Sequence, residues 1–112
     1  MTTYFVSRHS GAVAWAAEEG IIVDKCISHL DVQTIKQDDV VIGTLPVHMV
    51  AAICSRGGRY LHLNIELSPE LRGKELTAAD MRACHVRLEG YSACSDHSFD
   101  LMRVDGNAVR AE

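Results

Sequence analysis

In Tyr4-Phe5-Val6-Ser7-Arg8-His9-Ser10-Gly11, a short apolar run ends in three side chains that can bind phosphates or transfer protons. Tyr, Phe and Val favour β-strands, and Ser10-Gly11 opens an alanine-rich stretch that favours a helix. The pattern therefore places Ser7, Arg8 and His9 at the carboxyl end of a strand. In an open α/β sheet, ligands bind at that end of the strands.

Length and composition indicate one soluble domain. The chain has 112 residues, of which 47% are hydrophobic and 23% are charged, and this balance is ordinary for a globular protein. No apolar run approaches the roughly 20 residues of a membrane span, so no membrane partner is expected. The N-terminus lacks a basic segment followed by an apolar core, which makes the cytoplasm the expected location.

The net charge argues against a long anionic ligand but is compatible with a small one. With 15 Asp and Glu against 11 Lys and Arg, the formal net charge is −4, and the resulting field repels long polyanions. Genomic DNA is therefore not an expected partner. A small anion is compatible with this charge, because surface charge is screened within about 10 Å while a few amides and arginines act locally.

The four cysteines give little sign of a metal site or a disulfide framework. Cys26, Cys54, Cys84 and Cys94 form no C-x-x-C pair, and the first three lie in apolar stretches. This pattern favours buried free thiols. Cys94 and His97 are two soft ligands without a second clustered pair, so we predict no metal site and no cofactor.

The first half of the chain alternates strand and helix patterns. We predict a strand over residues 4–8, a helix over residues 12–19 that ends at Gly20, and a second strand over residues 25–30. The connection over residues 31–39 is short for a parallel crossover, although Asp31 can cap one helical turn there. Both parallel and antiparallel pairing of the second strand remain open.

In the second half we predict a third strand over residues 40–45, whose apolar part is unbroken, as is typical of a central strand buried on both faces. Pro46 is expected at the first position of a helix that runs to Gly57-Gly58. Residues 59–67 alternate apolar and polar side chains, which predicts a half-exposed strand at an edge or a dimer seam.

A capping box, Thr77-Ala-Ala-Asp80, predicts a last helix that runs to about Glu89. Periodicity is lost after Gly90. We therefore expect a domain over residues 1–90 and a loosely ordered C-terminal tail over residues 91–112.

Together these elements predict an α/β fold, a small Rossmann-like open sheet of about four mostly parallel strands in the order 2-1-3-4, flanked by helices. That order has a switch point between the first and third strands. The loop over residues 7–11 and the loop over residues 43–46 would face each other there, each leading into a helix N-terminus, and a phosphate would suit the space between them.

Several motifs resemble those of a known family, the small CRISPR-associated ring nucleases of type III loci. The resemblance covers most of residues 3–90 and rests on five stretches, namely Tyr4-Phe-Val-Ser-Arg-His9 with Gly11, Ala12 and Trp15, Val41-Ile-Gly-Thr-Leu-Pro46, Arg59-Tyr-Leu-His-Leu63, Arg72-Gly73 and Glu75-Leu-Thr77. The tail after Tyr91 lies outside it.

The resemblance implies a homodimer that binds a cyclic oligoadenylate, most simply cyclic tetra-adenylate, across its two-fold axis. It further implies metal-independent cleavage to linear products that end in a 2′,3′-cyclic phosphate, which switches off type III antiviral signalling. A ring with two-fold symmetry suits an isologous dimer in which each chain supplies half of the site. A non-catalytic sensor or sequestering module of the same fold, and a structural subunit of a CRISPR complex, are the alternatives.

Three residues of the opening stretch are the candidate catalytic groups. His9 suits a general acid or base, although a histidine there could instead cap local backbone groups. Arg8 suits a phosphate clamp, or else pairing with a carboxylate such as that of Asp31. Ser7 is expected to orient phosphate rather than attack it, because the ribose 2′-hydroxyl is the nucleophile in the reaction that the resemblance implies.

The candidate ligand-binding residues lie at the starts of the helices and in one later loop. They are Ser10, Gly11, Gly43, Thr44, Leu45, Pro46 and Arg72. Thr44 can donate a hydrogen bond to phosphate or ribose, and Gly43 permits a close approach. Arg72 and Lys74 suit either a loop that closes over the ligand or a surface turn, whereas His29 and His62 fit core or interface positions on strands.

Overall fold

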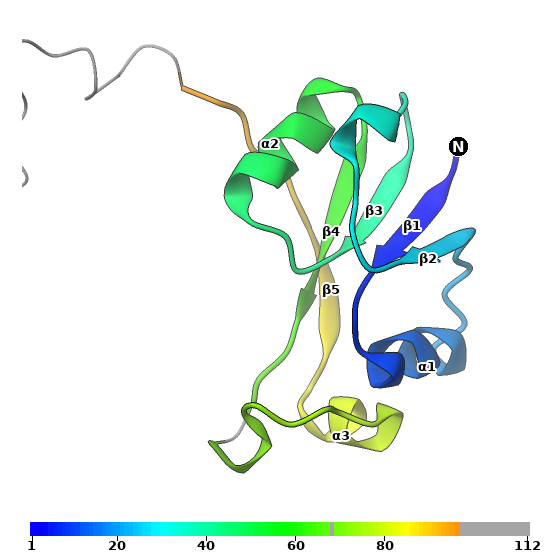
Figure 1. Cartoon of the computed structure of the whole chain (residues 1–112), viewed down its shortest axis with the longest axis vertical. Coiled ribbons are helices and arrows are strands. Elements are labelled where there is room, and N and C mark those ends of the chain that lie inside the picture. Colours follow the sequence, from blue (N-terminus) through cyan, green and yellow to red (C-terminus); the bar gives the residue numbers. More distant parts are fainter. Residues whose placement is uncertain (68, 97–112) are drawn as a thin grey trace, which may run out of the picture.

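The computed structural model describes residues 1–67 and 69–96, which form an α/β domain built on one five-stranded sheet (Figure 1). The strands are β1 (Thr3–Val6), β2 (Lys25–Ile27), β3 (Val40–Gly43), β4 (Arg59–Asn64) and β5 (Arg87–Tyr91). Their spatial order is β2-β1-β3-β4-β5. The predicted order 2-1-3-4 is confirmed, and a fifth strand extends it.

Parallel pairing joins the first four strands, and β5 runs antiparallel to β4. The pairing direction of β2, which the sequence left open, is therefore parallel. The prediction that residues 59–67 lie at an edge of the sheet is wrong, because β5 covers the side of β4 that would have been free. The alternative, a dimer seam, stays a prediction. The strand also ends at Asn64 rather than Leu67.

Helices cover both faces of the sheet (Figure 1). They are α1 (Ser10–Glu18), α2 (Val47–Ser55) and α3 (Ala78–Ala83), with short 3-10 turns η1 (Val32–Thr34) and η2 (Pro69–Leu71). Helices α1 and α3 pack together on one face and are joined by an ion pair between Glu18 and Arg82. Helix α2 and turn η1 lie on the other face.

Alternating strand residues divide the core into two layers. Phe5 and Ile42 point into the layer under α1 and α3, whereas Tyr4, Val6 and Val41 point into the layer under α2. This period of two is what a strand buried on both faces requires, since successive side chains point to opposite sides. The central position predicted for the third strand is confirmed.

The predicted helix ends are partly confirmed. Gly20 ends the first helical segment in the left-handed region with φ 74°, and the Asp31 carboxylate accepts a hydrogen bond from the Gln33 N–H at the start of η1, as expected. Helix α1 begins earlier than predicted, at Ser10. Pro46 is the N-cap of α2 and lies one position before the helix rather than in its first turn.

The last predicted helix is much shorter than expected. The capping box of Thr77 and Asp80 is present, but α3 ends at Ala83 instead of about Glu89. His85 then adopts a left-handed conformation with φ 52°, which turns the chain back toward the sheet. Residues 87–91 form β5, so Tyr91 belongs to the sheet, while most of the predicted tail, residues 97–112, lies outside the described part.

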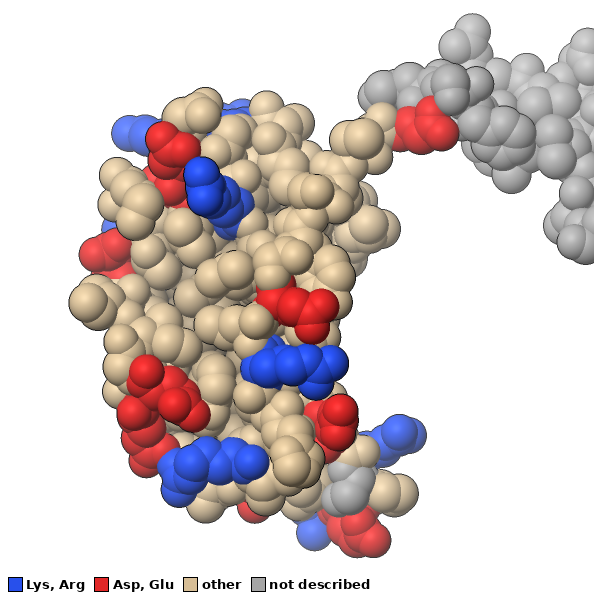
Figure 2. All heavy atoms as spheres, turned by 180° about the vertical axis from the view of Figure 1, so that it is seen from behind, with Lys and Arg blue, Asp and Glu red and all other residues tan. Residues whose placement is uncertain are grey.

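The surface of the described part is mixed in character. Figure 2, which views the molecule from behind, shows Lys and Arg interspersed with Asp and Glu rather than gathered into one patch on that face. No helix within the described ranges is long and apolar enough to cross a membrane. All four cysteines are free, but only Cys84 is buried; Cys26, predicted to be buried, is exposed on the short edge strand β2.

Asp39 fastens the N-terminal strand to the body of the sheet. Its side chain is 4% exposed, and its two carboxylate oxygens accept hydrogen bonds from the Thr2 and Lys36 N–H groups, each at 2.9 Å. The backbone hydrogen bond from Lys36, followed by that from Thr2, holds the pKa of Asp39 below its usual range. The charged carboxylate therefore stabilises the register of β1 beside β3.

We predict that Asp39→Asn lowers the free energy of unfolding at neutral pH by about 1–3 kcal/mol, because the amide nitrogen would face a backbone N–H with no acceptor. The contribution of Asp39 is fully present above the unfolded pKa of about 3.9 and is lost as pH falls through the lower folded pKa. The stability gap between parent and variant should therefore narrow in acid. Urea unfolding at several pH values measures it.

Asp38→Asn is the matched control. Asp38 is exposed and has φ 67°, a conformation that asparagine tolerates well. This change should leave stability nearly unaltered at every pH. Equal losses from the two substitutions would contradict the role assigned to Asp39.

Candidate functional site

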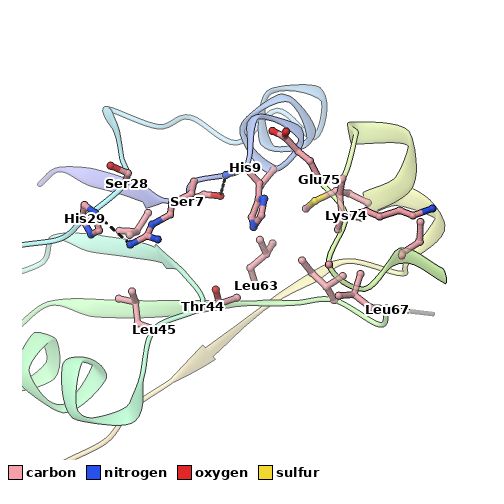
Figure 3. Close-up of a pocket in the computed structure, with 18 of the residues that line it drawn as sticks. Ser7, His9, Ser28, His29, Thr44, Leu45, Leu63, Leu67, Lys74 and Glu75 are labelled. Atoms are coloured by element: carbon pink, nitrogen blue, oxygen red, sulfur yellow. Dashed lines mark hydrogen bonds between the residues drawn. The ribbon is translucent and has the colours of Figure 1, made fainter. Parts of the chain in front are cut away.

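A cleft of about 1020 Å³ opens at the carboxyl ends of the four parallel strands (Figure 3). Its polar side chains follow β1, β2 and β3, and others come from the segment between β4 and α3; they are Ser7, Arg8, His9, Ser28, His29, Thr44, Lys74 and Glu75. Leu63, Ile65, Leu67 and Leu71 line an apolar wall. The cleft lies at the switch point where the sequence placed a ligand.

The β1 loop directs His9 into the cleft. The Ser7 hydroxyl accepts a hydrogen bond from the His9 N–H at 3.1 Å, which fixes the turn between strand and helix. His9 is the N-cap residue of α1, but its side chain makes no capping hydrogen bond. Figure 3 shows the exposed ring pointing from the start of α1 toward Leu63. The imidazole is therefore available to a ligand.

Arg8 contacts a histidine rather than a carboxylate. Its Nη2 atom donates to Nε2 of His29 at 3.4 Å, which requires that nitrogen to be unprotonated. The carboxylate of Asp31 instead caps η1, so the alternative pairing of Arg8 with Asp31 does not form. Across residues 1–67 and 69–96, no carboxylate forms an ion pair with Arg8. Its positive charge is available to an anionic ligand.

The β3 loop supplies Thr44 and Leu45 to the opposite wall. Gly43, the last residue of β3, lies so close to β1 that an added Cβ would be 2.9 Å from the Val6 carbonyl oxygen. Glycine is therefore needed for the approach of the two strands. Pro46 is exposed and lies outside the cleft lining.

Ser10 and Gly11 hold α1 against the segment that precedes α3. The Ser10 hydroxyl donates to the Glu75 carboxylate at 3.2 Å. A Cβ on Gly11 would lie 1.7 Å from the Leu76 carbonyl oxygen, so only glycine permits this contact. The structure thus places both residues at a packing contact beside the cleft, not among its lining residues.

The segment between β4 and α3 closes one side of the cleft. Gly73, Lys74 and Glu75 line it, whereas Arg72, the residue predicted there, is exposed and does not. In Figure 3 the Lys74 side chain extends away from His9, and the Glu75 carboxylate points toward α1. Lys74 is therefore not directed at the polar end of the cleft, and Arg72 does not line the cleft at all.

Sequence reasoning missed His29 and Ser28 because it extended the second strand to Leu30. A strand of that length would hold both residues within the sheet, but β2 ends at Ile27, and they fall at its carboxyl end. Glu75 gave no local signal, since it reaches Ser10 across 65 residues of sequence. The sequence offered one clue, that two polar residues, Ser28 and His29, stand near the end of the predicted strand.

No group of three or more His, Cys, Asp or Glu side chains suited to a metal ion occurs within residues 1–67 and 69–96. His97, which the sequence paired with Cys94, lies outside these ranges. What the cleft does bring together is an arginine and two histidines, with a threonine opposite. Such a set can bind phosphate, stabilise developing negative charge and transfer protons.

Residues 4–94 match the model of a family described as "Putative CRISPR-associated protein (Cas_VVA1548)". The match includes every cleft residue named above and all of the sheet except Thr3, the first residue of β1. The chain belongs to this family. Among curated proteins and solved structures, the CRISPR-associated chain has no match. Its activity must therefore be inferred from the cleft.

Proposed function

We propose that this protein is a ring nuclease that acts in the cytoplasm on cyclic oligoadenylate, most simply cyclic tetra-adenylate, and so switches off type III antiviral signalling. Its CRISPR association and its motif resemblance to ring nucleases support the proposal. The observation that carries it is the convergence of Arg8, His9 and His29 in one cleft, with Thr44 on the opposite wall.

The proposed reaction is an in-line attack by a ribose 2′-hydroxyl on the adjacent phosphorus. A base removes the proton of the 2′-hydroxyl, the new P–O bond forms, and the P–O bond to the 5′-oxygen of the next nucleotide breaks. An acid gives a proton to that leaving oxygen. The products are a 2′,3′-cyclic phosphate and a 5′-hydroxyl, so the atoms balance without any co-reactant.

The cleft offers a group for each part of this step. His9 and His29 can serve the two proton transfers, because an imidazole can act as acid or base near neutral pH. Arg8 can stabilise the charge on the phosphorane-like transition state, since no carboxylate in the described ranges neutralises it. Ser7 and Thr44 can orient phosphate or ribose by neutral hydrogen bonds.

The apolar wall suits the bases of the ligand. Leu63, Ile65, Leu67 and Leu71 present aliphatic surface beside the polar residues, and ligand pockets generally combine such surface with a few directed polar groups. A ligand with flat purines and anionic linkages has both features. Long duplex DNA does not fit, because it would bring many phosphates to a chain of net charge −4.

The first prediction of this proposal is turnover that survives chelation. The purified protein should convert labelled cyclic tetra-adenylate to linear products with a 2′,3′-cyclic phosphate end, and excess EDTA should leave the rate unchanged. Chromatography of the products measures both. Tight binding without any product would instead favour the sensor or sequestering module, and loss of cleavage in EDTA with recovery on added divalent metal would overturn the metal-free mechanism.

The second prediction assigns His9 and Arg8 to the chemical step and Thr44 to ligand binding. His9→Ala should lower the single-turnover rate by about 10²–10⁴-fold through loss of a proton transfer, and Arg8→Ala by about 10²–10³-fold through loss of charge stabilisation. Thr44→Ala should mainly weaken affinity, by about fivefold, since a neutral hydrogen bond serves ground and transition states alike. Rates at saturation and dissociation constants are measured separately.

His48→Ala and Arg59→Ala are the matched controls. His48 lies on α2 outside the cleft, and Arg59 lies at the amino end of β4, away from the candidate site. Both variants should cut at the parental rate. If His9→Ala and Arg8→Ala also cut at that rate once saturated, the reaction takes place elsewhere, and the loop of Arg72 and Lys74 becomes the next candidate.

The third prediction is a homodimer. A cyclic tetranucleotide carries four phosphates, whereas the described part of one chain supplies a single arginine to the cleft lining. Two chains related by a two-fold axis are therefore expected to share the ring. Light scattering should give twice the mass of one chain when cyclic tetra-adenylate is bound. A ligand-bound monomer would contradict the shared site. It would not contradict cleavage by a single chain, which the turnover assay tests separately.

A further inference from the structure

The hydroxyl of Tyr60 lies beneath the β3 loop and contacts three polar groups. The Leu45 N–H donates to it at 2.9 Å, the Gly43 carbonyl oxygen lies 2.9 Å away, and Nδ1 of His62 lies 2.7 Å away. Tyr60 itself is only 3% exposed. One buried hydroxyl therefore holds the backbone on both sides of Thr44.

The three contacts are all hydrogen bonds in only one arrangement of protons. The Gly43 carbonyl can only accept, so the single hydroxyl proton must go to it. The two lone pairs of the hydroxyl oxygen then accept from the Leu45 N–H and from Nδ1–H of His62. Burial raises the pKa of the Tyr60 hydroxyl, so the donor proton is retained at neutral pH.

We propose that Tyr60 is a positioning residue of the site, which fixes the Gly43–Leu45 backbone so that Thr44 faces the loop of Arg8 and His9. Tyr60 does not line the cleft, so its hydroxyl acts on ligand affinity only through the backbone that it holds. The effect of Tyr60 on ligand affinity rests on the proposed function, whereas its effect on the Gly43–Leu45 backbone does not.

The hydrogen bonds of Tyr60 matter for the cleft because Gly43, one of the residues they hold, lies very close to β1. The β3 end approaches β1 so closely that a Cβ on Gly43 would lie 2.9 Å from the Val6 carbonyl oxygen, so a small shift of the loop alters its spacing from the β1 loop. A hydrogen bond to an exposed threonine depends on that spacing. The ring of Tyr60 is packed in the core with Val41 and Ile53, which gives the hydroxyl a fixed origin.

Tyr60→Phe keeps the ring and removes the hydroxyl. In the full chain, amide hydrogen exchange at Leu45 should become about tenfold faster, because its N–H loses its acceptor. Nitrogen NMR of the parent should show a proton on Nδ1 of His62. These two readouts need no ligand, so they test the positioning role even if cyclic oligoadenylate proves not to be the substrate.

With cyclic tetra-adenylate, Tyr60→Phe should weaken affinity by about threefold to tenfold and leave the single-turnover rate at saturation nearly unchanged. The double variant with Thr44→Ala should bind no more weakly than Thr44→Ala alone, since both changes remove the same contact. Additive losses would overturn the positioning role. Failure of the parental protein to bind the ring would count against the proposed function alone.

Tyr91→Phe is the matched control. The Tyr91 hydroxyl donates to the Glu89 carboxylate on exposed strand β5, and its ring meets His62 edge-on at 5.8 Å. Removing this hydroxyl should change neither Leu45 exchange nor ligand affinity. Equal exchange at Leu45 in Tyr60→Phe and the parent would overturn the proposal outright.

Discussion

The parallel pairing of β1 with β3 is the constraint on which the rest of the molecule depends. Tyr4 lies beside Val41 and Phe5 beside Ile42, and these side chains fill both core layers. The chain then leaves β1 toward α1 on one face and leaves β3 toward α2 on the other. Because the two exits diverge, the loops separate beyond the close contact at Gly43 and leave the cleft between them.

The parts of the fold that were predictable are those in which local pattern and burial agree. The apolar runs of β1 and β3 are buried on both faces, so composition alone identifies them. Strand β5 was missed because most of its residues, Arg-Leu-Glu-Gly-Tyr, are exposed and so show no buried apolar pattern. The segment also contains a glycine and follows a capping box that favoured a longer helix. The left-handed turn at His85 that ends the helical segment early is a tertiary effect, since histidine does not demand that conformation.

The site residues, too, were predictable where they follow strongly patterned strands and not where they belong to weak elements. Ser7, Arg8, His9 and Thr44 were identifiable because they come directly after buried strands, and all of them line the cleft. Residues from weaker elements were misjudged, since β2 is a three-residue edge strand whose end cannot be located from periodicity. Gly11 looked like a ligand-binding glycine, but its lack of a side chain serves the contact of α1 with Leu76. Only the packing of distant segments distinguishes these two uses of glycine.

Charge inside the cleft limits which groups can hold an anion. The start of α1 already faces a carboxylate of the same chain, because Glu75 accepts the hydrogen bond of Ser10. Helix α2 follows Pro46, which has no N–H to donate. Two helix N-termini were expected to hold phosphate, yet Arg8 is the cation best placed to do so, since Lys74 extends away. In a dimer with a two-fold axis, the second chain would bring its own Arg8 to the site. The sparse positive charge of one cleft is therefore a reason to expect a site shared by two chains.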